Sequence, residues 1–307
     1  MNKYYLGIDG GGTKTKVIVI DDHERIIYEA VGGPSSIDTV DGEKTFLSIE
    51  KALDEFFKVN QGVFFSAIFA GIGGIVFEAD YKYVVNLLSG LKGVNNDTLI
   101  KARNDMENAL YSGLCFHEGI VLIVGTGMVV YGRDTYGNTH KCGGWGYKVG
   151  DEGSGYDLGL KAIKHVIRVL DHRLTLTDFA AEIATHIGIT QATDIVPWMN
   201  LNYTNRTVIA DLAPIVTKHA NLGNAFAKEI VDEATSELAL AVQGVYHKLK
   251  LKNEKLVIVG SLGNASGYFK NQLHQKIHGI SRFIEITGPQ IDPALAAAMM
   301  ALKNTKS

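Results

Sequence analysis

Cysteine is scarce in this chain, which has two cysteines among its 307 residues. Cys115 and Cys142 are too few for a disulfide framework, and neither belongs to a CxxC motif of the kind that holds zinc or an iron–sulfur cluster. We therefore expect both side chains to be ordinary reduced thiols.

An excess of one charge is also missing, because 30 Lys and Arg residues stand against 33 Asp and Glu residues, for a net charge of −3. Without a long run of basic residues, nucleic acid is not an expected partner. No apolar stretch is long enough to span a bilayer, and the run 1–6 leads directly into a strand without a signal peptide. We expect no membrane partner and a cytoplasmic location.

The first third of the chain alternates between the two regular structures. Residues 4–9, 15–21 and 26–31 are rich in Ile, Val and Tyr and predict an antiparallel meander of three strands. The spacing of apolar residues then predicts the following elements in chain order: helix 43–58, strand 63–70, helix 81–91, strand 99–102 and helix 105–114.

A second meander, at 119–131, repeats the design of residues 4–20 about 115 residues later. Each copy has an apolar strand, a turn of Gly and Thr, and a second apolar strand. Beyond Gly153 the chain is mainly helical, with its longest helix at 225–249, a strand at 256–259 and a helix opened by Asp292. We predict two related domains, residues 1–116 and 117–289, with 290–307 returning to the first as a helix.

The glycine-rich turn after the first strand predicts an anion site. Glycine tolerates positive φ and has no Cβ, so Gly11 and Gly12 can expose backbone N–H groups to a ligand. Thr13 and Lys14 add a hydroxyl and a cation, and Asp9 can hold Mg²⁺ through water. The spacing fits neither a Walker A loop nor a GxGxxG fingerprint. An empty hairpin turn is the alternative.

Gly125, Thr126 and Gly127 form the corresponding turn of the second meander. They can present backbone amides in the same way, so that two such turns could hold a triphosphate from both sides.

The run 142–155 holds six glycines around one tryptophan and two carboxylates. Trp145 can lie against a sugar ring while Asp151 or Glu152 accepts hydrogen bonds from its hydroxyls; a packed loop with a core tryptophan is the alternative. Asp105 follows a predicted strand, where its carboxylate can point into a cleft, or can serve only as a helix N-cap.

Together these segments resemble the N-acetylglucosamine kinase branch of the sugar kinase, actin and heat-shock chaperone ATPase superfamily, with its BadF/BadG-type ATPases. The resemblance is good over about residues 4–160 and is limited to short segments from there to about residue 303. Its most specific element, 142–155, is similar to the family signature CGGWG…GDEGS. It implies an α/β fold of two ribonuclease H-like (actin-like ATPase) domains with a cleft between them.

The resemblance also implies roles for individual residues. It implies ATP as cofactor with Mg²⁺ at Asp9, and Asp105 as the base that takes a proton from the sugar hydroxyl. Nucleotide contacts fall on Gly11, Gly12, Thr13, Lys14, Gly125, Thr126, Gly127, Gly260 and Ser261. Sugar contacts fall on Ser36, Gly73, Asn104, Asp105, Thr126, Gly144, Trp145 and Asp151.

One departure concerns the substrate, because Ser36 stands where the family usually has asparagine. The predicted reaction is phosphorylation of the 6-hydroxyl of an amino sugar, N-acetylglucosamine or N-acetylmuramic acid, by a homodimer. The alternatives are a glucosamine kinase, an ATPase that activates a dehydratase or reductase, and a sugar-responsive module without catalysis.

Overall fold

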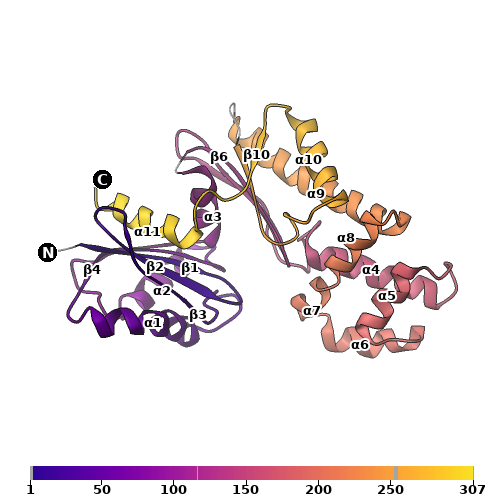
Figure 1. Ribbon diagram of the computed structural model, residues 1–307, viewed down its shortest axis with the longest axis horizontal. Coiled ribbons are helices and arrows are strands. Elements are labelled where there is room, and N and C mark those ends of the chain that lie inside the picture. Colours follow the sequence, from indigo (N-terminus) through magenta and orange to yellow (C-terminus); the bar gives the residue numbers. More distant parts are fainter. Residues whose placement is uncertain (1–2, 116, 252–254, 307) are drawn as a thin grey trace. The chain divides into compact units, whose positions relative to one another are not determined.

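The computed structural model describes residues 3–115, 117–251 and 255–306 (Figure 1). The chain forms two compact units. We call residues 1–117 together with 289–307 the N-terminal unit, and residues 118–288 the central unit.

A five-stranded sheet in the order β3-β2-β1-β4-β5 forms the centre of the N-terminal unit. The first three strands pair antiparallel, and β4 and β5 continue parallel to β1. The strand bounds are β1 Tyr4–Gly10, β2 Thr15–Asp21, β3 Ile26–Gly32, β4 Phe65–Ile72 and β5 Leu99–Arg103.

Helices cover both faces of this sheet, because successive strand residues alternate between two apolar cores. Leu6 and Ile8 belong to the core shared with α1 (Gly42–Val59) and α2 (Glu78–Leu88). Tyr5 points to the opposite face, which is covered by α3 (Asp105–Leu114) and α11 (Pro293–Asn304).

The C-terminal helix α11 lies unusually close to the sheet, with Gly7 of β1 directly beneath it. A Cβ on Gly7 would collide with the backbone of Ala294 and lie 2.8 Å from the Cα of Ala298. This approach explains why α11 is rich in alanine, since a larger side chain would hold the helix off the strand.

The central unit has a second five-stranded sheet, in the order β10-β9-β6-β7-β8. Read from the far edge, the order repeats that of the first sheet: three antiparallel strands, then two parallel ones. The strand bounds are β6 Gly119–Val124, β7 Met128–Arg133, β8 Thr139–Gly143, β9 Lys255–Val259 and β10 Glu285–Thr287. The predicted repeat is confirmed.

Helices make up most of the remainder of the central unit. The longest, α9 (Ala225–Leu249), contacts β6, β7 and β8 and packs with α4, α8 and α10 in one continuous core. The other elements are α4 Gly155–Leu170, α5 Asp178–Ile187, η1 Ala192–Asp194, α6 Ile195–Asn202, α7 Arg206–Ala210, α8 Ala213–Asn221 and α10 Tyr268–Ile280.

Most predicted elements are confirmed, and two have shifted bounds. Strand β4 begins two residues later than predicted and extends to Ile72, because its pairing with β1 continues to Gly10. Helix α2 begins three residues earlier, since Asp80 accepts the N–H groups of Val76 and Phe77 and fixes the helix start there. Strands β8 and β10 were not predicted.

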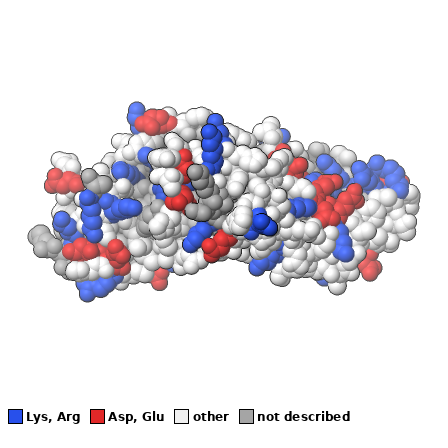
Figure 2. Space-filling view, turned by 90° about the horizontal axis from the view of Figure 1, so that it is seen from above, with Lys and Arg blue, Asp and Glu red and all other residues white. Residues whose placement is uncertain are grey.

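Charged side chains of both signs are interspersed on the face shown in Figure 2. Among the described residues, no helix is both long and apolar enough to cross a lipid bilayer.

Candidate functional site

The first glycine turn, between β1 and β2, is fixed by backbone hydrogen bonds. The N–H of Gly11 donates to the carbonyl of Lys14 at 3.0 Å, and the Gly11 carbonyl accepts the N–H groups of Ser35 and Ser36 at 3.1 and 3.2 Å. The turn is thereby attached to the segment 34–38.

Glycine in this turn serves only one of the two purposes we predicted, because the positive φ is not used and only the missing Cβ remains as a reason. Neither Gly11 nor Gly12 has a φ in the left-handed region, so the turn does not need glycine for its backbone conformation. A Cβ on Gly11 would find its nearest atom 3.5 Å away, and Gly12, Thr13 and Lys14 are exposed. A Cβ on either glycine would only touch its neighbours at van der Waals distance, and the absence of both side chains leaves the exposed backbone of Gly12 uncovered, as a bound anion requires.

Asp9, the last polar residue before the turn, is held by a side chain that the sequence analysis missed. Asn108 of α3 is fully buried, and its Nδ2 donates to the carbonyl of Ile8 at 3.0 Å and to Oδ1 of Asp9 at 2.9 Å. Burial raises the pKa of Asp9 to about 6, against the Asn108 hydrogen bond that lowers it, and the charge of Asp292 adds to the rise.

The residues around Asp9 fit a magnesium ion whose ligands are mostly phosphate oxygens and waters. Among the described residues, no group of three or more His, Cys, Asp or Glu side chains is placed to hold a metal. Mg²⁺ bound to phosphates, however, needs only one or two carboxylates and keeps several waters. Asp9 offers one carboxylate, and the buried Oδ1 of Asn108, whose Nδ2 donates to Asp9, has no hydrogen-bond partner among the described residues.

Asp105 is the first residue of α3, at the end of β5. The N-cap is Asn104, whose side chain accepts the N–H of Met106 at 3.1 Å and donates to the carbonyl of Ile75 at 3.0 Å. The alternative that Asp105 is the N-cap is therefore wrong. Burial raises the pKa of Asp105 to about 7, and the charges of Asp9 and Asp38 contribute to the rise.

The segment 34–38 lies next to this carboxylate. Oδ2 of Asp105 is 3.5 Å from the place where a Cβ on Gly73 would stand, and the same Cβ would collide with the hydroxyl of Ser36. Ser36 is only 4% exposed, and its hydroxyl donates to the carboxylate of Asp38. The structure thus brings Ser36, Gly73 and Asp105 together and adds Asp38, which the sequence analysis did not identify.

The second glycine turn, between β6 and β7, is docked onto the start of α4. The N–H of Gly155 donates to the carbonyl of Gly125 at 2.7 Å, and the N–H of Tyr156 donates to that of Thr126 at 3.1 Å. Gly260 has a φ of +100° and packs against Val124, the residue before the turn. The predicted nucleotide residues of the central unit therefore lie close together.

Asp151 lies in the glycine-rich loop between β8 and α4. Its side chain is 2% exposed, and its φ of 65° is in the left-handed region. Its Oδ2 lies 3.2 Å from Nη2 of Arg206, the first residue of α7. Burial raises the pKa of Asp151, while Arg206 opposes the rise. A Cβ on Gly127 would lie 2.5 Å from Nη2 of Arg206 and 3.1 Å from Oδ2 of Asp151, so the ion pair rests on the glycine turn.

Arg206 is the residue whose role the sequence analysis missed most completely. It lies 55 residues from Asp151, and no motif marks it. Its guanidinium also lies 5.8 Å from the ring centre of Tyr147, and its buried Nε has no hydrogen-bond partner among the described residues.

Trp145 is exposed over 64% of its surface. The alternative in which this side chain belongs to the core is therefore wrong. The ammonium of Lys141 lies 3.8 Å from the centre of the Trp145 ring, and Gly144 before it has a φ of +67° that favours glycine. The loop thus presents an aromatic side chain to solvent.

Comparisons with known proteins agree with the resemblance. The model of the BadF/BadG/BcrA/BcrD ATPase family matches residues 6–301. An N-acetylmuramic acid/N-acetylglucosamine kinase of Clostridium acetobutylicum is 30% identical, with 97% of this chain and 98% of that protein covered. An N-acetyl-D-glucosamine kinase of Dictyostelium discoideum is 26% identical, with 98% of each covered.

Among solved structures, a proposed N-acetylglucosamine kinase of Chromobacterium violaceum superposes with a TM-score of 0.77. It is 22% identical, and the superposition covers 97% of this chain and 99% of that one. The two sheets of this chain share one strand order. Together with this superposition, the shared order confirms the predicted α/β class with two ribonuclease H-like halves.

Proposed function

We propose that this chain, which belongs to the BadF/BadG/BcrA/BcrD ATPase family, phosphorylates the 6-hydroxyl of an amino sugar with ATP. The observation that carries the proposal is the similarity to the Clostridium kinase, which extends over nearly the whole of both chains at 30% identity. The polar groups of both units supply chemistry that suits this reaction.

Asp105 is the proposed general base. A carboxylate with a pKa near 7 holds a proton well enough to take one from a hydroxyl, and still loses it near neutral pH. As the sugar oxygen forms its bond to the γ-phosphorus and the bond to ADP breaks, the hydroxyl proton passes to Asp105. Asn104 fixes the start of α3 and so positions this carboxylate.

The two glycine turns are the proposed phosphate contacts, with the exposed Gly12 and the partly exposed Gly11 in one unit and the partly exposed Gly125 and Gly127 in the other. Thr13 and Lys14 add a donor and a cation, and Gly260 with Ser261 adds a contact on the nucleotide. Mg²⁺ bound to ATP would neutralise phosphate charge, with Asp9 as its proposed carboxylate.

The glycine-rich loop is the proposed sugar contact of the central unit. The exposed ring of Trp145 can lie against the apolar face of a sugar, and Asp151 can accept a hydroxyl hydrogen bond through the carboxylate that Arg206 and the backbone of Met128 hold in place. In the N-terminal unit, Ser36 and Asp38 offer a hydroxyl and a carboxylate beside Asp105.

Arg206 is the proposed positioning residue for Asp151. Replacing Arg206 with glutamine should raise the KM for the sugar about 10- to 100-fold, because the lost charged hydrogen bond is worth roughly 1.5–3 kcal/mol. The KM for ATP and kcat should change less than about threefold, and Arg206→Lys should recover part of the sugar affinity. Steady-state kinetics with each substrate varied separately measure this split.

Lys148→Gln is the matched control, because the Lys148 ammonium also lies over the Tyr147 ring, at 5.9 Å. It should leave both KM values unchanged. If Arg206→Gln raised the KM for ATP instead, Arg206 would be a phosphate ligand and not a positioning residue for the sugar site.

A panel of sugars tests the function itself. We expect N-acetylglucosamine and N-acetylmuramic acid to be phosphorylated at the 6-hydroxyl, because the small side chain of Ser36 replaces the family's asparagine and leaves room beside the sugar. N-acetylmannosamine, glucosamine and glucose should have kcat/KM values at least about tenfold lower, since they lack or misplace the acylated amine. Coupled ADP release measures the rates, and phosphorus NMR identifies the product.

The alternatives give other outcomes in the same assay. A preference for glucosamine would make the chain a glucosamine kinase. ATP hydrolysis without any dependence on sugar would favour an activating ATPase, and sugar binding without a phosphorylated product would favour a non-catalytic module.

A further inference from the structure

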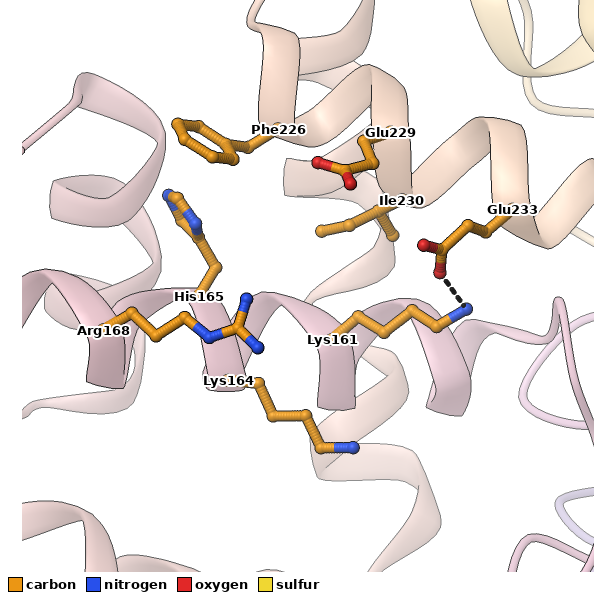
Figure 3. Close-up of a pocket in the computed structure, with 8 residues that line it drawn as sticks. All are labelled: Lys161, Lys164, His165, Arg168, Phe226, Glu229, Ile230 and Glu233. Atoms are coloured by element: carbon orange, nitrogen blue, oxygen red, sulfur yellow. Dashed lines mark ion pairs between the residues drawn. The ribbon is translucent and has the colours of Figure 1, made fainter. Parts of the chain in front are cut away.

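A pocket of about 180 Å³ lies between α4 and α9 of the central unit, apart from the residues assigned above (Figure 3). Helix α4 contributes Lys161, Lys164, His165 and Arg168, and α9 contributes Phe226, Glu229, Ile230 and Glu233. From Gly155, which binds the second glycine turn, to Arg168 the helix rises about 20 Å.

Two cations of α4 are not neutralised at this pocket. Lys161 is paired with Asp157 at 3.1 Å and with Glu233 at 3.0 Å. Neither Lys164 nor Arg168 forms an ion pair with a residue of the described ranges. These two stand four residues apart on the helix, where like charges repel each other. An anion between them would relieve that repulsion.

His165 adds an unsatisfied buried nitrogen to the wall of the pocket. The side chain is 5% exposed, with its ring 4.3 Å from that of Phe226 and 5.5 Å from that of Phe179. Its Nε2 is buried and has no hydrogen-bond partner in the described part of the chain. A buried polar atom without a partner destabilises the fold, and it is typical of places where a ligand or water completes the structure.

The pocket is amphipathic, which narrows the class of ligand. Figure 3 shows the Arg168 guanidinium beside the His165 ring, while Glu229 comes from the facing helix and Lys164 extends away from α9. A guanidinium binds phosphate in a fork, and the flexible stem of Lys164 can bring its ammonium to the same anion. Glu229 repels an anion but accepts hydrogen bonds from hydroxyls, and Phe226 with Ile230 offers an apolar surface.

We propose that this pocket is a second binding site, for a phosphorylated sugar, with the phosphate on Arg168 and Lys164 and a hydroxyl on Glu229. The ring lies against Phe226 and Ile230. Because α4 begins on the carbonyls of Gly125 and Thr126, an occupant of the pocket contacts the same helix that supports the second glycine turn.

Calorimetric titration of the full chain with glucose 6-phosphate and with inorganic phosphate, in the absence of ATP, tests the site. Arg168→Gln should weaken glucose 6-phosphate binding at least tenfold. Lys248→Gln, which removes one positive charge from an exposed position of α9 outside the pocket, should leave it unchanged. Any binding at the proposed kinase site is common to all these proteins and cancels in the comparison.

Glu229→Gln separates the two parts of the ligand. It should weaken glucose 6-phosphate binding, while inorganic phosphate binds equally well or better because a repelling charge is gone. Wild-type affinity in Arg168→Gln would overturn the site, and equal affinity for glucose 6-phosphate and inorganic phosphate would overturn the sugar phosphate as its ligand. Neither result depends on turnover, so the proposed kinase reaction stands or falls separately.

Discussion

Replacing Asp105 with asparagine should lower kcat by about 10²- to 10⁴-fold, the usual contribution of a general base. The amide keeps the size and shape of the side chain but cannot take the hydroxyl proton. The KM values for sugar and ATP should change little, since Asn104 still fixes the start of α3. Steady-state kinetics measure the effect, and a variant with wild-type kcat would remove Asp105 from the mechanism.

The same carboxylate sets a pH dependence. Because its pKa is raised to about 7, Asp105 is increasingly protonated below that pH and cannot act as a base. For the wild-type protein, kcat/KM for the sugar should therefore rise with pH through about 7 and then level off.

Stability should move in the opposite direction from activity. The folded state favours the protonated form of Asp105, so its contribution to stability is fully present below pH 4 and is lost as the pH rises through about 7. Asparagine is neutral throughout, and at pH 8 Asp105→Asn should raise Tm by about 2 °C.

Asp80→Asn is the matched control for Asp105, because Asp80 also stands in the first turn of a helix in the N-terminal unit. Its carboxylate accepts the N–H groups of Val76 and Phe77, and these bonds lower its pKa. This variant should keep its turnover and gain no stability. A similar loss of kcat in both variants would indicate general damage to the unit.

Gly7→Ala should strongly destabilise the N-terminal unit. The new Cβ would stand inside the backbone of α11, 2.8 Å from the Cα of Ala298, and neither β1 nor the helix can move without opening its core. Overpacking of this kind costs about 3 kcal/mol or more. Chemical denaturation followed by circular dichroism should show an early transition, with loss of kinase activity.

Gly279→Ala is the control for Gly7, since a Cβ on this glycine of α10 would meet no atom within 4 Å. In a helix the change should stabilise by about 0.5–1 kcal/mol. Equal stability of Gly7→Ala and wild type would show that α11 does not rest on β1.

Periodicity and turn chemistry predict the fold well where elements are long or strongly patterned. The bounds of α3 and α9 agree with the prediction, because each has a polar cap and a regular apolar face. Strands β8 and β10 were missed for a physical reason. The first is partly exposed along its length, and the second has three residues, so neither carries an alternating apolar pattern.

The site was predictable only in its local parts. Asp9 is the last residue of the first predicted strand and Asp105 follows another strand, so both could be chosen from sequence. Their partners could not, because contacts across the fold decide them: Asn108 reaches β1 from α3, and Arg206 reaches Asp151 from 55 residues away. Asp38 was not predicted, because only the folded segment 34–38 brings its carboxylate to the Ser36 hydroxyl and to Asp105.

The position of α11 also has a consequence for synthesis of the chain. A ribosome adds about 5–20 residues per second. Roughly 10 to 40 s therefore pass between the synthesis of the first half of the N-terminal unit and the synthesis of its last helix, α11. During that interval the sheet face that includes Tyr5, Ile18 and Phe69 has no α11 to cover it. The central unit, whose residues are contiguous, can fold first, whereas the first half of the N-terminal unit cannot bury this face until α11 has been synthesised.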